Sequence, residues 1–269
     1  MLALAFDTAT PTLSLALISY DLSPPGEKSQ RHESGEAKAT LTPRAQKFTM
    51  SYELLEETEG PPLSTHSSVL PELVESVFKK RAISVRDLSL IACGRGPGSF
   101  TGLRTGLAYA KGLGFGANIV VGVPTLAALA WNPSLSDGIY ASSVDARHGE
   151  IFVQLFRRLE GELRDLSGIL VARPAQICQT IKDSLQEGGH DPSKDPIKLI
   201  GPGAALVEAL DAGFVKGSLD GPKASTIGVL GIRLNQEDGP EKHPPLPLYG
   251  RSPAIFKTWI PPRRLPASS

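Results

Sequence analysis

Cysteine, aromatic side chains and an excess of either charge are all scarce in this sequence. The chain has 269 residues, two cysteines, 6% aromatic residues, and 28 Lys and Arg against 28 Asp and Glu, so its formal net charge is zero. Cys93 and Cys178 have no CxxC or zinc-ligand spacing, which excludes a disulfide scaffold and indicates buried thiols in a reducing compartment. The zero net charge excludes nucleic-acid binding through bulk positive charge. It leaves a local basic cluster near the C-terminus at Arg251, Lys257, Arg263 and Arg264.

Long apolar runs are missing as well. The best stretch, Ile119–Trp131, is interrupted by Gly122 and Pro124, so it is too short to cross a bilayer. Met1–Ser19 is apolar, but no basic segment precedes its apolar residues and it carries Asp7, which argues against a secretory signal. Together these absences predict a cytoplasmic protein without membrane contact.

Two segments of the sequence repeat each other. Ala5–Ala9 and Ser143–Arg147 each place an Asp after a short apolar strand, and an alternating strand follows each. Each segment opens a series of strands that ends in a helix, a β-β-β-α unit. The repeat predicts an α/β protein of two related lobes with a cleft between them. We place the boundary after residue 122, so that the lobes are residues 1–122 and 123–269.

Patterns in the first lobe predict two helices and two long loops. Apolar residues three and four apart predict a helix over Ser67–Arg81, and a second helix is expected over Ser99–Phe115. Residues 21–43 are rich in Pro, Ser, Glu, Lys and Gly and poor in apolar residues, so we expect a long loop insertion there. A second extended loop is expected over Glu56–Ser64. The polar, Pro-rich residues 236–247 and 260–269 are expected to form flexible tails.

Residues 94–104, with the sequence GRGPGSFTGLR, follow an apolar strand and open the second helix. Alternating glycines let a backbone turn tightly or approach a ligand closely, and Ser99 is a good N-terminal cap. Free amides at a helix N-terminus attract anions. One interpretation is therefore an anion or nucleotide site formed by Gly96, Gly98, Ser99 and Thr101. The alternative is a tight strand-to-helix connection, because the segment lacks the Lys-Ser/Thr pair of a P-loop.

The second helix carries a small-residue stripe, Gly102, Gly106, Ala110 and Gly114, at intervals of four. Each interior glycine costs about 0.8–1 kcal/mol relative to alanine. Some neighbour must therefore approach this face closely. An apolar set lies on the opposite face, which places the helix between two neighbours. Either both neighbours belong to this chain, or one is a helix of a partner protein.

Asp7 and Asp145 follow the first strands of the two lobes. In two-lobed nucleotide-binding folds an acidic residue at this place holds a hydrated cation against phosphates. The alternative is that each carboxylate caps its own turn. None of the five histidines has a second His or a Cys at helical spacing, and His66, at the start of the first helix, is expected to cap it or lie on the surface. We predict no metal ligand and no catalytic residue in this chain.

Three motifs together are similar to the TsaB (YeaZ) family over nearly the whole chain: FDTATPTLSLAL, GRGPGSFTGLRTGLAYAKGL and VDARHGEIF. The resemblance implies the two-lobed actin-like/Hsp70/sugar-kinase (ASKHA) fold. It also implies a role beside a paralogue, TsaD, in making threonylcarbamoyladenosine next to the anticodon of tRNA. In TsaD a His-x-x-x-His pair holds the metal. Thr125 and Leu129 stand at the matching positions here and cannot serve as such ligands.

The resemblance also implies partners. Members pair through the two helices of the first lobe, which adds Leu73 and Val77 to the small-residue stripe as partner-interface residues. TsaE, an ATPase, docks on the TsaB–TsaD pair. A homodimer of the free chain, ATP or ADP at the partner interface and indirect contact with tRNA are further expectations. No cofactor of its own is expected.

We therefore expect a non-catalytic subunit that supports TsaD. The alternative from another class is an ATP-dependent phosphotransferase on the same fold, with Asp7 and Asp145 flanking the cleft and Gly201–Gly203 near an adenosine. Against it stands the absence of any further acid or base to activate an acceptor hydroxyl. A metallopeptidase, the third alternative, requires the missing His pair.

Overall fold

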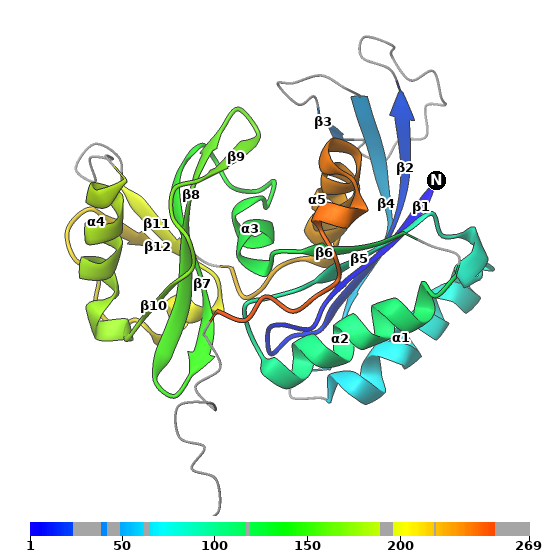
Figure 1. Cartoon of the computed structure of the whole chain (residues 1–269), viewed down its shortest axis with the longest axis horizontal. Coiled ribbons are helices and arrows are strands. Elements are labelled where there is room, and N and C mark those ends of the chain that lie inside the picture. The colour runs from blue at the N-terminus through cyan, green and yellow to red at the C-terminus, as the bar shows by residue number, and fades with distance from the viewer. Residues whose placement is uncertain are drawn as a thin grey trace, which may run out of the picture.

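The computed structural model describes residues 1–23, 39–41, 49–61, 65–116, 119–188, 196–217 and 219–250, with backbone alone for 39–41. Within these residues the chain forms two sheets flanked by helices (Figure 1). The first sheet contains β1 (Leu2–Asp7), β2 (Ser14–Ser23), β3 (Ala39–Leu41), β4 (Thr49–Glu59), β5 (Leu90–Gly94) and β6 (Ile119–Val123). The second contains β7 (Gly138–Arg147), β8 (Glu150–Leu159), β9 (Glu162–Asp165), β10 (Leu170–Ala172), β11 (Ile197–Ile200) and β12 (Phe214–Lys216).

The helices lie between and around these strands. The α-helices are α1 (His66–Arg81), α2 (Phe100–Leu113), α3 (Thr125–Ala130), α4 (Ile177–Glu187) and α5 (Ala224–Asp238). Short 3-10 turns are η1 (Val85–Asp87), η2 (Pro174–Gln176), η3 (Pro202–Leu206) and η4 (Pro240–Lys242). The two helices expected in the first lobe are therefore present, each within two residues of the predicted bounds.

The two sheets share one topology. The first has the strand order β3-β4-β2-β1-β5-β6, and the second has β10-β8-β7-β11-β12 with β9 beside β8. In each sheet an antiparallel hairpin, β1–β2 or β7–β8, is extended by two parallel strands. This agreement confirms the predicted α/β fold of two related lobes.

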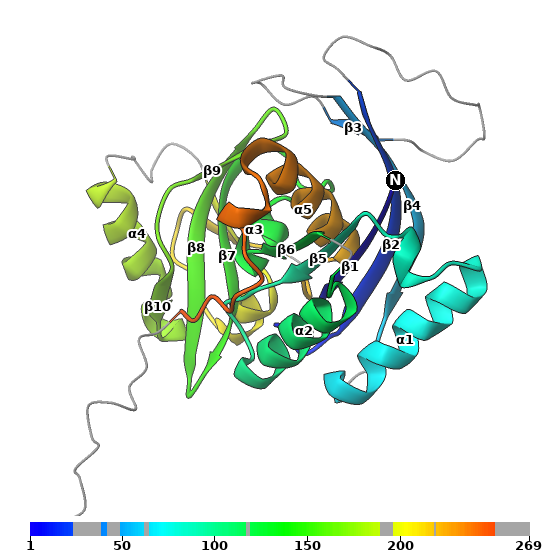
Figure 2. The same ribbon diagram turned by 45° about the vertical axis from the view of Figure 1, so that its right-hand side comes forward.

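Helices cover both faces of the first sheet. α1 and α2 lie on one face and α5 lies on the other (Figures 1 and 2). The predicted lobe boundary is therefore wrong for residues 224–238, because α5 returns to pack on β1, β2 and β5. Gly228 and Gly231 permit this packing, since a Cβ at either position would overlap the side chain of Ile18 or Ala92. In the second lobe, α3 and α4 cover opposite faces of the sheet.

The expected insertion is partly strand. β2 continues to Ser23 and residues 39–41 form β3 beside β4, while the rest of 21–43 lies outside the described residues. β4 runs through Glu59 because it pairs with β2 along the length of that strand, so no loop begins at Glu56. The prediction of a tail over residues 236–247 is wrong, because α5 continues to Asp238, η4 follows, and the carbonyl of His243 accepts a hydrogen bond from Gly122 N. The other predicted tail, residues 260–269, lies outside the described residues.

The first half of the small-residue stripe of α2 faces this chain's own β1–β2 turn, and Gly114 faces Val120 of β6. A Cβ at Gly102 would overlap the carbonyl oxygen of Thr8, and one at Gly106 would overlap the Thr8 hydroxyl. That hydroxyl donates a hydrogen bond to the carbonyl of Gly102 at 2.8 Å. Five of the expected partner-interface residues are buried within the first lobe, which corrects the prediction for them: Val77, Gly102, Gly106, Ala110 and Gly114. Leu73 is only partly buried, and its place at a partner interface stays a prediction. The close neighbour is a turn of the same chain.

Asp7 joins three segments in the interior of the first lobe. Its carboxylate accepts hydrogen bonds from Ala9 N at 2.8 Å and from the Thr125 hydroxyl at 3.0 Å. Thr125 Oγ1 in turn accepts from Gly96 N at 3.1 Å. Gly94 has no room for a side chain, because a Cβ there would overlap the Asp7 carboxylate. Complete burial raises the pKa of Asp7 to about 6, against the hydrogen bonds that lower it.

Residues 243–250, which we call the strap, run from the first lobe to the second (orange to red in Figure 1). The carbonyl of His243 accepts a hydrogen bond from Gly122 N at 2.9 Å, and Leu248 N donates to the carbonyl of Arg95 at 2.7 Å. Gly250 then lies against the ring of Phe152 on β8. Together with α3 and the connection from β12 to α5, the strap is the third place where the chain crosses between lobes within the described ranges.

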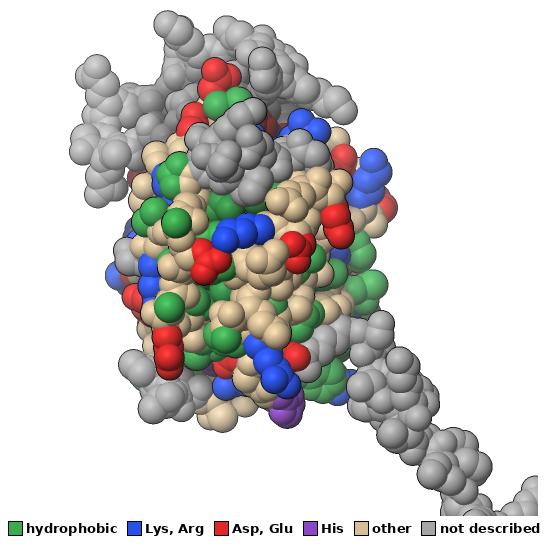
Figure 3. Space-filling model, turned by 90° about the vertical axis from the view of Figure 1, so that its left-hand side faces the viewer, with side chains coloured by type: hydrophobic (Ala, Val, Ile, Leu, Met, Phe, Trp, Pro, Cys, Tyr) green, Lys and Arg blue, Asp and Glu red, His purple; other side chains and the backbone are tan. Residues whose placement is uncertain are grey.

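The charged surface is mixed in sign where Figure 3 shows it. On this face of the second lobe, Lys and Arg side chains are interspersed with Asp and Glu. The pattern agrees with the balanced composition of the whole chain. Of the helices in the described ranges, none has both the length and the apolar character needed to span a membrane.

Gly106→Ala should destabilise the protein, whereas Gly112→Ala should not. The new methyl at position 106 would be forced against Thr8, and overpacking of this kind typically costs about 1–3 kcal/mol. Gly112 lies on the same helix with no heavy atom within 4 Å of the added Cβ. Alanine there should stabilise the helix by up to about 1 kcal/mol. Urea denaturation measures both, and equal effects of the two substitutions would show that the turn does not rest on α2.

Asp7→Asn should change the pH dependence of stability. Because the folded-state pKa of Asp7 is raised to about 6 from an ordinary value of 3.8, the stabilising contribution is fully present below pH 3.8 and is lost as pH rises toward 6. The wild type should therefore lose about 2 kcal/mol relative to the Asn variant between about pH 4 and about pH 7. Denaturant unfolding across this range measures the difference. A gap between the two proteins that stays constant with pH would contradict the assignment.

Candidate functional site

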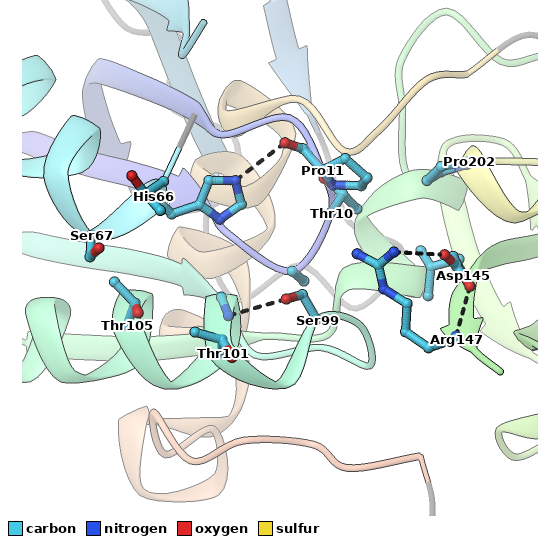
Figure 4. A pocket seen from close by; sticks show the side chains of 14 residues that line it. Thr10, Pro11, His66, Ser67, Ser99, Thr101, Thr105, Asp145, Arg147 and Pro202 are labelled. Carbon is cyan, nitrogen blue, oxygen red and sulfur yellow. Dashed lines mark hydrogen bonds and ion pairs between the residues drawn. The ribbon is translucent and has the colours of Figure 1, made fainter. Parts of the chain in front are cut away.

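A cleft of about 290 Å³ opens between the two lobes (Figure 4). Its walls come from the β1–β2 turn, the N-termini of α1 and α2, the end of β7 and the start of η3. Hydroxyl side chains dominate the first-lobe wall: Thr10, Thr65, Ser67, Ser99, Thr101 and Thr105. The cleft is thus a chamber with several hydroxyl groups on one wall, formed at the carboxyl ends of strands, where open α/β sheets bind ligands.

The N-terminus of α2 is seated directly on the β1–β2 turn. Ser99 N donates to the carbonyl of Ala9 at 2.7 Å, and Ser99 Oγ accepts from Gly102 N at 3.2 Å as the cap of the helix. Thr101, one residue into the helix, lines the cleft. Two of the residues predicted for an anion site, Ser99 and Thr101, therefore do face the cleft.

The glycines of this segment do not face the cleft. Gly96 has its N–H bonded to Thr125, and Gly98 lies so close to the first lobe that a Cβ would overlap the carbonyl of Ala9. Neither residue lines the cleft. Their prediction as anion-binding residues is corrected, because the glycines bring this chain's own backbones together. The alternative of a tight strand-to-helix connection describes them.

The two candidate aspartates have different environments. Asp7 is completely buried and does not line the cleft, so its prediction as a ligand of a hydrated cation is corrected. Asp145 lines the cleft with 30% of its side chain exposed. It accepts a hydrogen bond from Arg147 N at 2.7 Å, so it caps its own turn, and it also lies 3.4 Å from the Arg147 guanidinium.

Two side chains with a titratable or charged group line the cleft without having been predicted as site residues. His66 projects from the start of α1 with Nε2 3.3 Å from the carbonyl of Pro11 (Figure 4). Arg147 stands on the opposite wall with a left-handed φ of 62° and a side chain that is 66% exposed. Arg147 belongs to the VDARHG motif, but the local sequence did not show that its side chain would face the first lobe.

The chemistry of this arrangement suits a small polar ligand. Arg147, Ser99 and Thr101 are the groups that could receive an anion, and Asp145 and His66 add hydrogen-bonding capacity. No group of three or more His, Cys, Asp or Glu side chains suited to a metal ion occurs in the part of the chain that the structure describes.

Comparison with known proteins connects this fold to tRNA modification. The family model described as "TsaD: tRNA N6-adenosine threonylcarbamoyltransferase" matches residues 63–215. The tRNA threonylcarbamoyladenosine biosynthesis protein TsaB of Escherichia coli is 35% identical over 99 residues, which span 35% of this chain and 42% of that protein. TsaB of Bacillus subtilis is 26% identical over 202 residues, or 72% of this chain and 83% of that protein. The match to the first relative thus covers less than half of its length.

A solved structure supports the fold over most of the chain. The crystal structure of an uncharacterized protein with similarity to peptidase YEAZ from Pseudomonas aeruginosa superposes with a TM-score of 0.67 at 23% identity, covering 93% of this chain and 99% of that one. The family model meanwhile spans more than half of the present sequence. The chain therefore belongs to the TsaB (YeaZ) group within the tRNA N6-adenosine threonylcarbamoyltransferase (TsaD) family.

Proposed function

We propose that this chain is a non-catalytic partner subunit, which binds and supports a TsaD-type protein in forming N6-threonylcarbamoyladenosine next to the anticodon of tRNA. The relatives from Escherichia coli and Bacillus subtilis carry the name of tRNA threonylcarbamoyladenosine biosynthesis proteins. The matching family model carries the name of the transferase itself. These names support a role in the synthesis of threonylcarbamoyladenosine. The proposal that this chain is the non-catalytic partner rests on Thr125 and Leu129.

The environment of Thr125 and Leu129 carries the proposal. These residues stand where the resemblance implies a metal-binding His pair in TsaD. Thr125 is buried and its hydroxyl is held between Asp7 and Gly96 N. Leu129 is 1% exposed in the apolar core between α3 and the second sheet. Both side chains are thus part of the packed interior of the fold. This supports the proposal that the subunit assists a TsaD-type protein and does not catalyse the transfer itself.

The partner surface that we propose is the outer face of α2. Exposed residues recur there at helical spacing: Thr101, Arg104, Ala108, Lys111 and Gly112. Ala108 and Gly112 would let another helix approach closely, because they carry little or no side chain. Phe115, 89% exposed at the end of the helix, adds apolar area of the kind found at interfaces. This face replaces the buried stripe as the pairing surface.

Further partners follow from the same proposal. TsaE would dock on the pair of this chain with the TsaD-type protein, and ATP or ADP would lie at the partner interface. The free chain would use the outer face of α2 to form a homodimer. Contact with tRNA would be indirect, which agrees with the zero net charge and the mixed surface of Figure 3.

The purified chain alone should transfer no threonylcarbamoyl group to tRNA. Mixed with a TsaD-type protein, TsaE and ATP, it should restore transfer that the same mixture lacks without it. Chromatographic analysis of the nucleosides from digested tRNA measures the product. Modified adenosine formed by this chain in the absence of the TsaD-type protein would overturn the proposal.

Ala108→Arg should weaken pairing with the TsaD-type protein by at least about tenfold, because a charged side chain would be buried at a close helix contact. Ala175→Arg, at an exposed alanine of the second lobe, is the matched control and should pair normally. Light scattering coupled to size exclusion measures pairing, and thermal melting shows that both variants are folded. Equal pairing by the two variants would exclude the outer face of α2.

A further inference from the structure

A side-chain ion pair joins the two lobes beside α3. Arg233 lies on α5, which packs on the first sheet, and Glu162 lies on β9 of the second sheet. Arg233 Nη2 is 2.5 Å from the Glu162 carboxylate. The lobes are therefore linked here through side chains, in addition to the places where the backbone crosses between them.

Arg233 is held in position for this contact from two further sides. Its Nε lies 2.6 Å from the carboxylate of Glu237, one turn further along α5. Its guanidinium is 4.7 Å from the centre of the Trp131 ring at the end of α3. Only 11% of the Arg233 side chain is exposed. Because these contacts fix the guanidinium before it meets Glu162, less side-chain entropy is lost in forming the interlobe pair.

A second arginine attaches the base of the Glu162 hairpin to α3. Arg158 lies on β8, which pairs with β9 as an antiparallel hairpin. Its Nη1 donates hydrogen bonds to the carbonyls of Trp131 at 3.1 Å and Asn132 at 2.9 Å, at the C-terminal end of α3. Arg158 thus keeps the second lobe on the crossing helix, while Glu162 reaches past that helix to α5. A rotation of the lobes about α3 would separate Glu162 from Arg233.

The cleft lies at the other end of the boundary between the lobes. In Figure 1 the β8–β9 hairpin and α5 occupy the upper half of the molecule, whereas the β7–β8 turn and α2 occupy the lower half. Neither Arg233 nor Glu162 lines the cleft. The cleft walls belong to different lobes, with Ser99 on one and Arg147 on the other. The same rotation about α3 would therefore change the width of the cleft.

We infer that Arg233 is an interlobe latch, whose bond with Glu162 holds the lobes in one orientation and thereby sets the width of the cleft. The latch acts at a distance from the cleft, through the rigid second sheet that carries both Glu162 and Arg147. This inference goes beyond the proposed function and does not depend on it.

Glu162→Gln tests the latch, because it keeps the shape of the side chain and removes the charge that pairs with Arg233. Glu237→Gln is the matched control. Glu237 contacts the same guanidinium at a similar distance, and 34% of its side chain is exposed against 32% for Glu162, but it lies on α5 itself. Loss of the Glu237 charge therefore removes an ion pair of the same kind without releasing the second lobe.

The orientation of the lobes can be measured in the full chain by electron–electron double resonance. Spin labels are attached at Glu72→Cys on α1 and Asp183→Cys on α4, which are exposed positions in different lobes, and both native cysteines are buried. Dilution with unlabelled chain confines the measurement to distances within one copy. Thermal melting shows that each variant is folded.

Glu162→Gln should broaden the distribution of interlobe distances and raise the population outside the wild-type peak about fivefold, since a partly exposed ion pair contributes modestly. Glu237→Gln should keep the wild-type distribution. A wild-type distribution in Glu162→Gln would overturn the inference. Equal broadening by the two variants would also overturn it, by showing that the charge on Arg233 matters only within α5.

Discussion

The seating of the β1–β2 turn on the glycine face of α2 is the contact on which the rest of the structure depends. Thr8 and Ala9 meet Gly102 and Ser99 through backbone atoms and one hydroxyl, with no space for intervening side chains. That contact sets the direction of α2, and therefore which of its residues face the cleft and which face solvent. The buried carboxylate of Asp7 braces the same turn from the other side.

Much of the fold was predictable from local pattern. The spacing of apolar residues located α1 and α2, and the repeated strand-Asp-turn motif predicted two related lobes, which the matching strand orders confirm. The return of α5 to the first sheet was not predictable in this way. Periodicity shows which residues share a helix face, but it does not show which sheet covers that face. Gly228 and Gly231 are needed because α5 packs closely against Ile18 and Ala92, which the sequence alone does not show.

The candidate site, like the fold, was only partly predictable from local pattern. Ser99, Thr101 and Asp145 were placed at the cleft by motif alone, whereas Gly96 and Gly98 looked like ligand contacts and proved to serve contacts within the chain. A glycine that accommodates a ligand and one that accommodates another strand look the same in sequence. α2 shows the problem directly, since it has small residues on two faces and one of them is buried. His66 and Arg147 lie 81 positions apart and line the same cleft only because of how the lobes are arranged.

The strap has a consequence for how this protein would meet another one. With α3 and the connection to α5, it links the lobes at three crossings in the described part of the chain, and its hydrogen bonds with Gly122 and Arg95 hold it against the first lobe until Gly250 reaches Phe152 of the second. A framework braced in this way retains little internal freedom that association could remove. Binding then sacrifices less conformational entropy, and a docking face is presented already in shape.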